Sequence, residues 1–163
     1  MGIQPQAVCH APGGASPVVF GRGTLKRIGS KPAVLLLDDD ERDLMLLEQI
    51  LRPDGFQVIK TTDPTHAFEL LASHPVGIVI SDQNMPGITG VEFLGRVRKL
   101  YPDVIRILFT SSPDPNAIAD AVNEAAIHKL MMKDWDGERL RTEVREVSRR
   151  YRPKDGTLPT SAR

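Results

Sequence analysis

Acidic, hydroxyl and basic side chains occur at four points of the sequence, each directly after an apolar run. Asp38–Asp40 follows the first run, Ser81–Asp82 the second, Thr110 the third and Lys133 the fourth. Clustered carboxylates repel one another unless a cation offsets their charge, and their hard oxygen atoms suit Mg²⁺. A carboxylate held beside Mg²⁺ and a lysine can attack a phosphoryl group. If the fold brings these residues together, they predict a site for Mg²⁺-assisted phosphoryl transfer.

The elements between these residues decide whether they can meet. Apolar runs predict five strands, at Ala33–Leu37, Phe56–Lys60, Val76–Ile80, Val104–Phe109 and Ile127–Met132. Helical spacing of apolar residues and Asp caps predict helices at residues 40–51, 63–73 and 91–100 and after residues 114 and 136. Such alternation is typical of an α/β protein with a parallel sheet and right-handed crossovers.

The two more polar strands, Phe56–Lys60 and Ile127–Met132, suit the edges of the sheet. This placement favours a flavodoxin-like five-stranded parallel sheet of order 2-1-3-4-5 with helices on both faces. In that fold the ligand site lies at the carboxyl ends of the first and third strands. Each polar group alone has an ordinary explanation, such as a helix cap. Their coincidence at successive strand ends favours a functional site.

Composition sets limits on the function. The chain has 163 residues, no formal net charge and one cysteine. It therefore lacks the excess of basic residues that is typical of nucleic-acid-binding proteins, and it cannot form an intrachain disulfide. The sequence shows no apolar run long enough to cross a membrane. We expect a cytoplasmic protein with a folded domain at 32–151. Residues 1–31 and 152–163 are expected to be a flexible arm and a flexible tail.

Four stretches resemble motifs of response-regulator receiver domains, the CheY-like superfamily of bacterial two-component systems. They are Leu37-Asp38-Asp39, the stretch Asp82–Gly87 with Gly90, the stretch Ile107–Ser111, and Met131-Met132-Lys133. The resemblance covers roughly residues 33–150. It implies that Asp82 is the phosphoacceptor and that Asp39 and Asp82 bind Mg²⁺. Asp38 would assist directly or through water, and Asn84 would offer its backbone carbonyl.

The resemblance also implies how the signal is received and relayed. Lys133 would pair with the phosphoryl group, and Thr110 would move toward it, coupling the site to the fourth helix, fifth strand and fifth helix. The donor would be a sensor histidine kinase or a phosphotransfer protein, and the only turnover would be self-dephosphorylation. The output partner stays unknown, with no direct contact to nucleic acid or membrane expected and a homodimer left open.

The region around Lys133 is similar to a receiver branch that has a Lys-Pro-Trp sequence there. Members of that branch are often attached to cyclic-di-nucleotide phosphodiesterase or transcription-activating domains. Asp134 replaces the proline and Leu130 replaces the usual aromatic. We therefore expect a trans Lys133–Asp134 bond and competition between Asp134 and the phosphoryl group for Lys133. We also expect the conformational readout on this face to be muted or differently wired. Ser112, two residues past the threonine, predicts a fairly durable phosphoryl group.

Two other functions are weighed against this hypothesis. A Mg²⁺-dependent phosphatase also uses an aspartyl phosphate, but it usually has an acid two residues after the nucleophile, where this chain has Asn84. A degenerate receiver could act as a phosphorylation-independent interaction module. The intact acidic, threonine and lysine positions argue against that alternative, whereas Leu130 and Asp134 keep it open.

Overall fold

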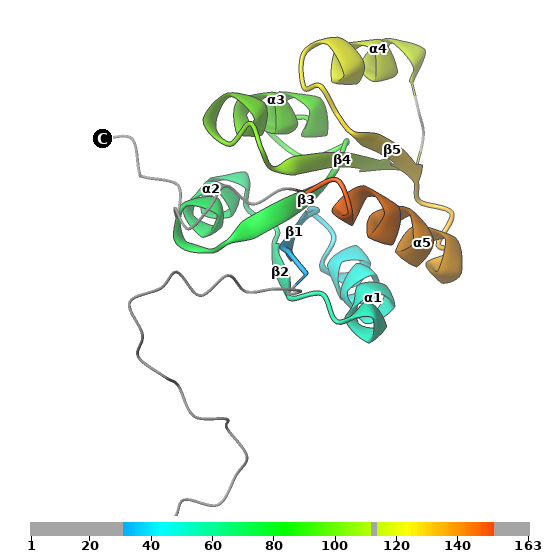
Figure 1. The fold of residues 1–163 in the computed structure, drawn as a ribbon. Helices are drawn as coiled ribbons and strands as arrows, with labels where there is room; N and C mark the ends of the chain where they lie inside the picture. Colours follow the sequence, from blue (N-terminus) through cyan, green and yellow to red (C-terminus); the bar gives the residue numbers. More distant parts are fainter. Residues whose placement is uncertain (1–30, 112–113, 152–163) are drawn as a thin grey trace, which may run out of the picture.

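The computed structural model of the chain describes residues 31–111 and 114–151, in which strands and helices alternate (Figure 1). The strands are β1 (Ala33–Leu37), β2 (Val58–Thr61), β3 (Val76–Asp82), β4 (Ile105–Thr110) and β5 (Lys129–Met132). The helices are α1 (Glu41–Leu51), α2 (Pro64–Ser73), α3 (Gly90–Leu100), α4 (Pro115–Asn123) and α5 (Gly137–Ser148). A short 3-10 turn, η1 (Arg52–Asp54), follows α1.

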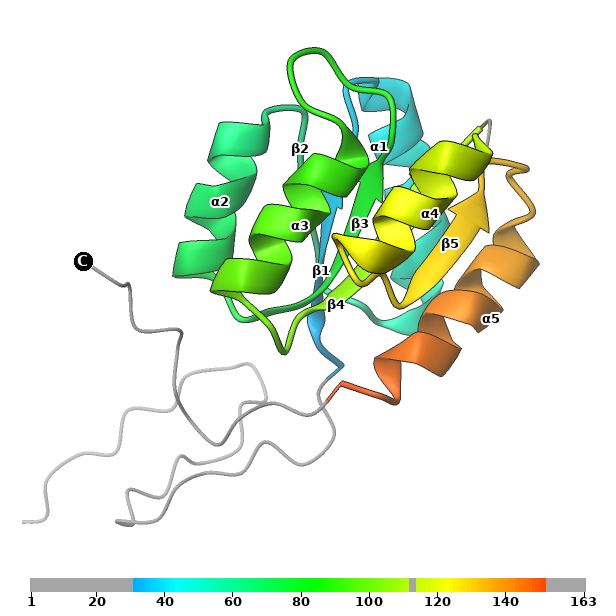
Figure 2. The same ribbon diagram turned by 90° about the horizontal axis from the view of Figure 1, so that it is seen from above.

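The five strands are parallel and lie in the order β2-β1-β3-β4-β5. Helices α1 and α5 cover one face of the sheet, and α2, α3 and α4 cover the other (Figure 2). Successive residues of a strand point to opposite faces, so Leu36 packs with the first pair of helices and Leu37 with the other three. The predicted flavodoxin-like fold and strand order are confirmed.

The helices begin where the sequence supplies a side chain that accepts a backbone N–H. Asp40, Asp63, Asp114 and Asp136 do this for α1, α2, α4 and α5. Thr89 caps α3 through a reciprocal capping box with a glutamate. Because each cap follows the carboxyl end of a strand, it fixes the loop that carries the polar residues of that sheet edge.

Several strand bounds differ from those predicted. β2 begins at Val58 rather than Phe56, because Gly55 ends η1 with a left-handed φ of 75° and the Phe56 ring enters the core. β5 begins at Lys129 rather than Ile127, whose N–H instead bonds the Ala121 carbonyl of α4. The predicted tail at 152–163 and all of the predicted arm except Lys31 lie outside the described residues.

A buried arginine on β4 ties the end of α4 to the sheet. Arg106 is only 5% exposed. Its guanidinium donates to four backbone carbonyls, those of Pro102, Val104, Ala125 and Ala126. Arg98 of α3, which is exposed, donates to the carbonyls of Asn123 and Glu124. The segment 123–126 at the end of α4 therefore accepts hydrogen bonds from one buried and one exposed guanidinium.

We predict that Arg106→Met lowers the free energy of unfolding by about 2–3 kcal/mol, because it leaves buried carbonyls without donors. Urea denaturation at neutral pH measures this change. Arg98→Met is the matched control and should cost less than about 1 kcal/mol, since water replaces its exposed contacts. Equal losses in the two variants would contradict this account of the α4–β5 junction.

Candidate functional site

The carboxyl ends of β1, β3, β4 and β5 bring the predicted polar residues to one edge of the sheet. Asp38 follows β1, Asp82 ends β3, Thr110 ends β4 and Lys133 follows β5. Asp82 pairs in register with Phe109, one residue before Thr110, and the Lys133 N–H donates to the Thr110 carbonyl at 2.9 Å. The sheet geometry alone therefore places acid, hydroxyl and amine on neighbouring strands.

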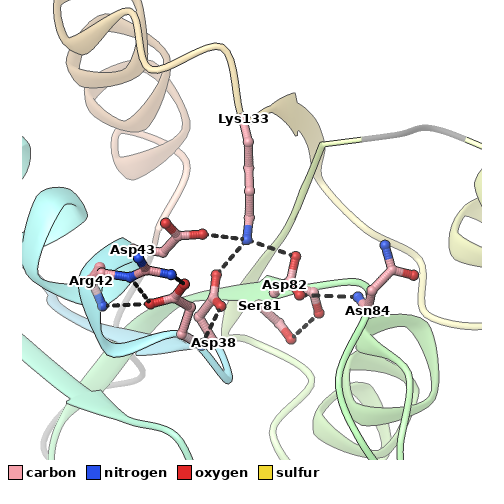
Figure 3. A network of polar contacts seen from close by, with 8 residues as sticks. Asp38, Arg42, Asp43, Ser81, Asp82, Asn84 and Lys133 are labelled. Carbon is pink, nitrogen blue, oxygen red and sulfur yellow. Dashed lines mark hydrogen bonds and ion pairs between the residues drawn. The ribbon is translucent and has the colours of Figure 1, made fainter.

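The Lys133 ammonium lies among three carboxylates (Figure 3). Its Nζ is 2.6 Å from Oδ2 of Asp38, 2.9 Å from Oδ2 of Asp43 and 3.0 Å from Oδ1 of Asp82. The lysine side chain is 10% exposed, and those of Asp38 and Asp82 are 2% and 7% exposed. Charges so far from solvent interact strongly, so this ion-pair network links the end of β1, the first turn of α1, the end of β3 and the end of β5.

The contacts of two aspartates in this region differ from what the sequence predicted. We expected Asp134 to compete for Lys133, and this expectation is wrong: Oδ2 of Asp134 instead pairs with Arg139 of α5 at 3.0 Å. The third partner of Lys133 is Asp43, in the first turn of α1, which the sequence analysis did not single out. Its position one turn after the acidic run was the available signal, because a helix places such a residue back over its own N-terminus.

The network is richer in negative than in positive charge. Burial raises the pKa of Asp38 above its usual value, against the hydrogen bond from Lys133, and the nearby Asp82 raises it further. Burial alone would lower the pKa of Lys133, but hydrogen bonds to its three carboxylates outweigh burial and raise it. Lys133 is therefore charged at neutral pH, while its buried carboxylates lack a full complement of cations.

The donor set fits a hard divalent cation. Asp38, Asp39 and Asp82 each offer a carboxylate oxygen, and these oxygens lie within 4.8 Å of one another. Asp38 and Asp82 are buried and Asp39 is exposed, so the group opens to solvent on one side. Mg²⁺ takes about six oxygen ligands and commonly keeps several waters, which suits a half-open group of three carboxylates. These residues would hold Mg²⁺, and the ion would offset their excess negative charge.

Asp40, the third acid of the run, belongs to α1 rather than to this group. Its carboxylate accepts the Arg42 N–H at 2.9 Å and pairs with the Arg42 guanidinium at 2.8 Å. The hydrogen bond from Arg42 lowers the pKa of Asp40 to about 2. Three consecutive aspartates thus separate into two site residues and one helix cap.

The loop after Asp82 holds the candidate phosphoacceptor from its own backbone. Oδ2 of Asp82 accepts the Asn84 N–H at 3.1 Å, and the Ser81 hydroxyl donates to the Asp82 carbonyl at 3.0 Å. Gly90 begins α3 so close to Asp82 that a Cβ there would lie 2.2 Å from the Asp82 carbonyl oxygen. Only glycine allows this approach, which explains its spacing from Asp82.

Large apolar side chains next to Thr110 and Lys133 lie on both faces of the sheet. Leu130 packs against the core beneath α2, α3 and α4. The edge-on pair of Trp135 and Phe109, with ring centroids 5.4 Å apart, lies on the α1 and α5 face. No peptide bond in residues 31–111 and 114–151 is cis, so Lys133–Asp134 is trans, as expected. Ser112 lies outside the described residues.

Comparisons with known proteins identify the family. The sequence profile of the response regulator receiver domain matches residues 34–145. The chain is 37% identical over 114 residues to the hydrogenase transcriptional regulatory protein HoxA of Cupriavidus necator, covering 70% of this chain and 23% of HoxA. It is 31% identical over 123 residues to the two-component response regulator ORR6 of Oryza sativa, covering 71% of this chain and 72% of that protein.

Solved structures agree with the sequence relatives. The signal receiver domain of an HD domain-containing protein from Pseudomonas fluorescens Pf-5 superposes with a TM-score of 0.71 at 36% identity, over 74% of this chain and 97% of that one. The chain spans about a quarter of the length of the HoxA proteins. No helix in the described part of the chain is long and apolar enough to span a membrane. The chain belongs to the family of response regulator receiver domains, the signalling domains of two-component systems.

Proposed function

We propose that this receiver domain accepts a phosphoryl group on Asp82. The observation that carries the proposal is the environment of its carboxylate, which is nearly buried, pairs with Lys133 at 3.0 Å and lies beside Asp38 and Asp39. The ion pair with Lys133 and the burial of the side chain hold this carboxylate in one position at the sheet edge. Its Oδ2 also accepts the backbone N–H of Asn84, which helps to orient the carboxylate.

These contacts suit transfer from a phosphohistidine. An oxygen of Asp82 attacks phosphorus, the phosphorus–nitrogen bond breaks, and its electron pair returns to the imidazole nitrogen, leaving an acyl phosphate on Asp82. Lys133 then pairs with an oxygen of the transferred group, and the Thr110 hydroxyl donates to another. Both residues start from neighbouring strand ends, so neither needs a large backbone movement to reach that group.

Mg²⁺ is the proposed cofactor of this transfer. Asp38, Asp39, Asp82 and the backbone carbonyl of Asn84 would hold it, with water completing the shell. When bound, the ion neutralises charge on the transferring phosphoryl oxygens. The fold itself places these ligand atoms. Asp38 and Asp82 lie at the ends of adjacent strands, and Asp39 lies on the solvent side of the pair.

The same chemistry supports a proposal about the partners. We infer that the donor is a sensor histidine kinase or a phosphotransfer protein and that the chain acts in the cytoplasm. The domain would relay its state by conformational change and lose the group by self-dephosphorylation rather than act on an external substrate. A homodimer is one proposed active form, supported by the beryllofluoride-activated NtrC4 receiver domain dimer, whose fold is similar at a TM-score of 0.68.

We predict that acetyl phosphate with Mg²⁺ adds one phosphoryl group to the protein, and that hydroxylamine removes it, as it does from an acyl phosphate. Asp82→Asn should abolish labelling, because the amide is not a nucleophile of comparable strength. Asp40→Asn is the matched control and should label like the wild-type protein, since asparagine caps a helix equally well. Intact-protein mass spectrometry gives the readout. Undiminished labelling of Asp82→Asn would refute the proposed acceptor.

We predict that Asp39→Asn weakens Mg²⁺ binding at least about tenfold, or roughly 1.4 kcal/mol, because one of three carboxylate ligands is lost. Calorimetric titration measures the affinity directly. Trp135, the single tryptophan, reports the same event through its fluorescence, as it packs on Phe109 beside the site. Asp134→Asn, which alters a carboxylate paired with Arg139, should leave the affinity unchanged. Equal effects of the two substitutions would argue against the ligand set.

A further inference from the structure

Asp43 is a fourth acid at the site, and it contacts the lysine rather than the acids that would bind metal. Its Oδ2 lies 2.9 Å from Nζ of Lys133. It does not belong to the group formed by Asp38, Asp39 and Asp82, whose oxygens lie within 4.8 Å of one another. A cation bound by those three acids therefore leaves Asp43 dependent on Lys133 for its counter-charge.

Lys133 has no donor to spare for a new partner. An ammonium carries three N–H groups, and Lys133 already has three carboxylate partners, Asp38, Asp43 and Asp82. A phosphoryl group on Asp82 would bring further oxygen atoms, each more negative than the carboxylate oxygen it replaces. One of those oxygens can take over the N–H that now points to Asp82, and any further oxygen that approaches the ammonium must share it with Asp43 or displace Asp43.

We propose that Asp43 is a positioning residue that competes with the phosphoryl group for Lys133 and so makes the phosphoryl-bound state less stable. The inference rests on the proposed phosphorylation of Asp82. Asp43 holds the ammonium toward the first turn of α1, while the phosphoryl group would draw it toward β3 (Figure 3). The negative charge of Asp43 also opposes the negative charge of the phosphoryl group at short range.

The exposure of Asp43 makes this competition reversible. Its side chain is 27% exposed, whereas that of Lys133 is 10% exposed. Water can therefore solvate Asp43 after the ammonium leaves it, and releasing it does not bury an unpaired charge. For the same reason a neutral side chain at this position should not prevent folding, and asparagine keeps the shape of the native residue.

The test measures the affinity of the protein for beryllofluoride, a phosphoryl mimic, at saturating Mg²⁺. Asp43→Asn should bind it about fivefold more tightly than wild type, the effect of removing roughly 1 kcal/mol of like-charge repulsion. Asp43→Glu restores the charge and should return the affinity toward the wild-type value. Asp134→Asn is the matched control, because its carboxylate pairs with Arg139. Its affinity should not change.

A spectroscopic readout separates competition for Lys133 from a general effect on folding. In ¹⁹F NMR of the bound mimic, the fluorine that faces the ammonium should shift in Asp43→Asn and return in Asp43→Glu. Asp43→Ala, in which alanine favours the helix, gives a second neutral variant, and thermal unfolding checks that each variant is folded.

The outcomes distinguish this inference from the proposed function. If the wild-type protein fails to bind beryllofluoride with Mg²⁺, both are overturned. If the wild-type protein binds it and the two neutral Asp43 variants bind equally well or more weakly, the role of Asp43 alone is overturned. Tighter binding by both neutral variants, reversed by Asp43→Glu, supports the competition.

Discussion

The ion-pair network around Lys133 is the interaction on which the rest of the site depends. One ammonium serves carboxylates from β1, α1 and β3, and two of those carboxylates are nearly buried. Burying charges is unfavourable unless they are paired, so the site gains when further positive charge enters. The excess of carboxylates over ammonium explains why the site fits a hard divalent cation. A bound cation or a phosphoryl group on Asp82 would each change how the carboxylates share the Lys133 ammonium.

Much of this arrangement could be predicted because parallel strands end at one edge of the sheet. The sequence therefore located Asp38, Asp82, Thr110 and Lys133 together, and the structure places them on adjacent strand ends. Asp43 could not be predicted in the same way, since its contact depends on the reach of a side chain from a helical turn. Strand bounds shifted by one or two residues for local reasons that the pattern does not show, such as the turn at Gly55 before β2 and the hydrogen bond from Ile127 to α4 before β5.

The substitutions near Lys133 alter the surroundings of the site more than its charge. Asp134 joins Arg139 in a surface pair, so the lysine keeps its carboxylates from other elements. Leu130, which replaces the aromatic residue expected at this point of the sequence, packs under α2, α3 and α4. Trp135 packs on Phe109 at the opposite face of the sheet. The aromatic side chain beside the end of β4, that of Trp135, therefore lies with α1 and α5. A response to phosphorylation would then change packing on this face rather than around residue 130.

The central claim is that Lys133 balances buried negative charge that a divalent cation can also balance. The most direct measurement is the unfolding free energy of Lys133→Met, with and without Mg²⁺. Without the ion this variant should lose about 3–5 kcal/mol relative to wild type, because Asp38 and Asp82 stay buried without their partner. Saturating Mg²⁺ should restore much of the loss. A variant as stable as wild type without Mg²⁺, or a loss that Mg²⁺ does not reduce, would contradict the account.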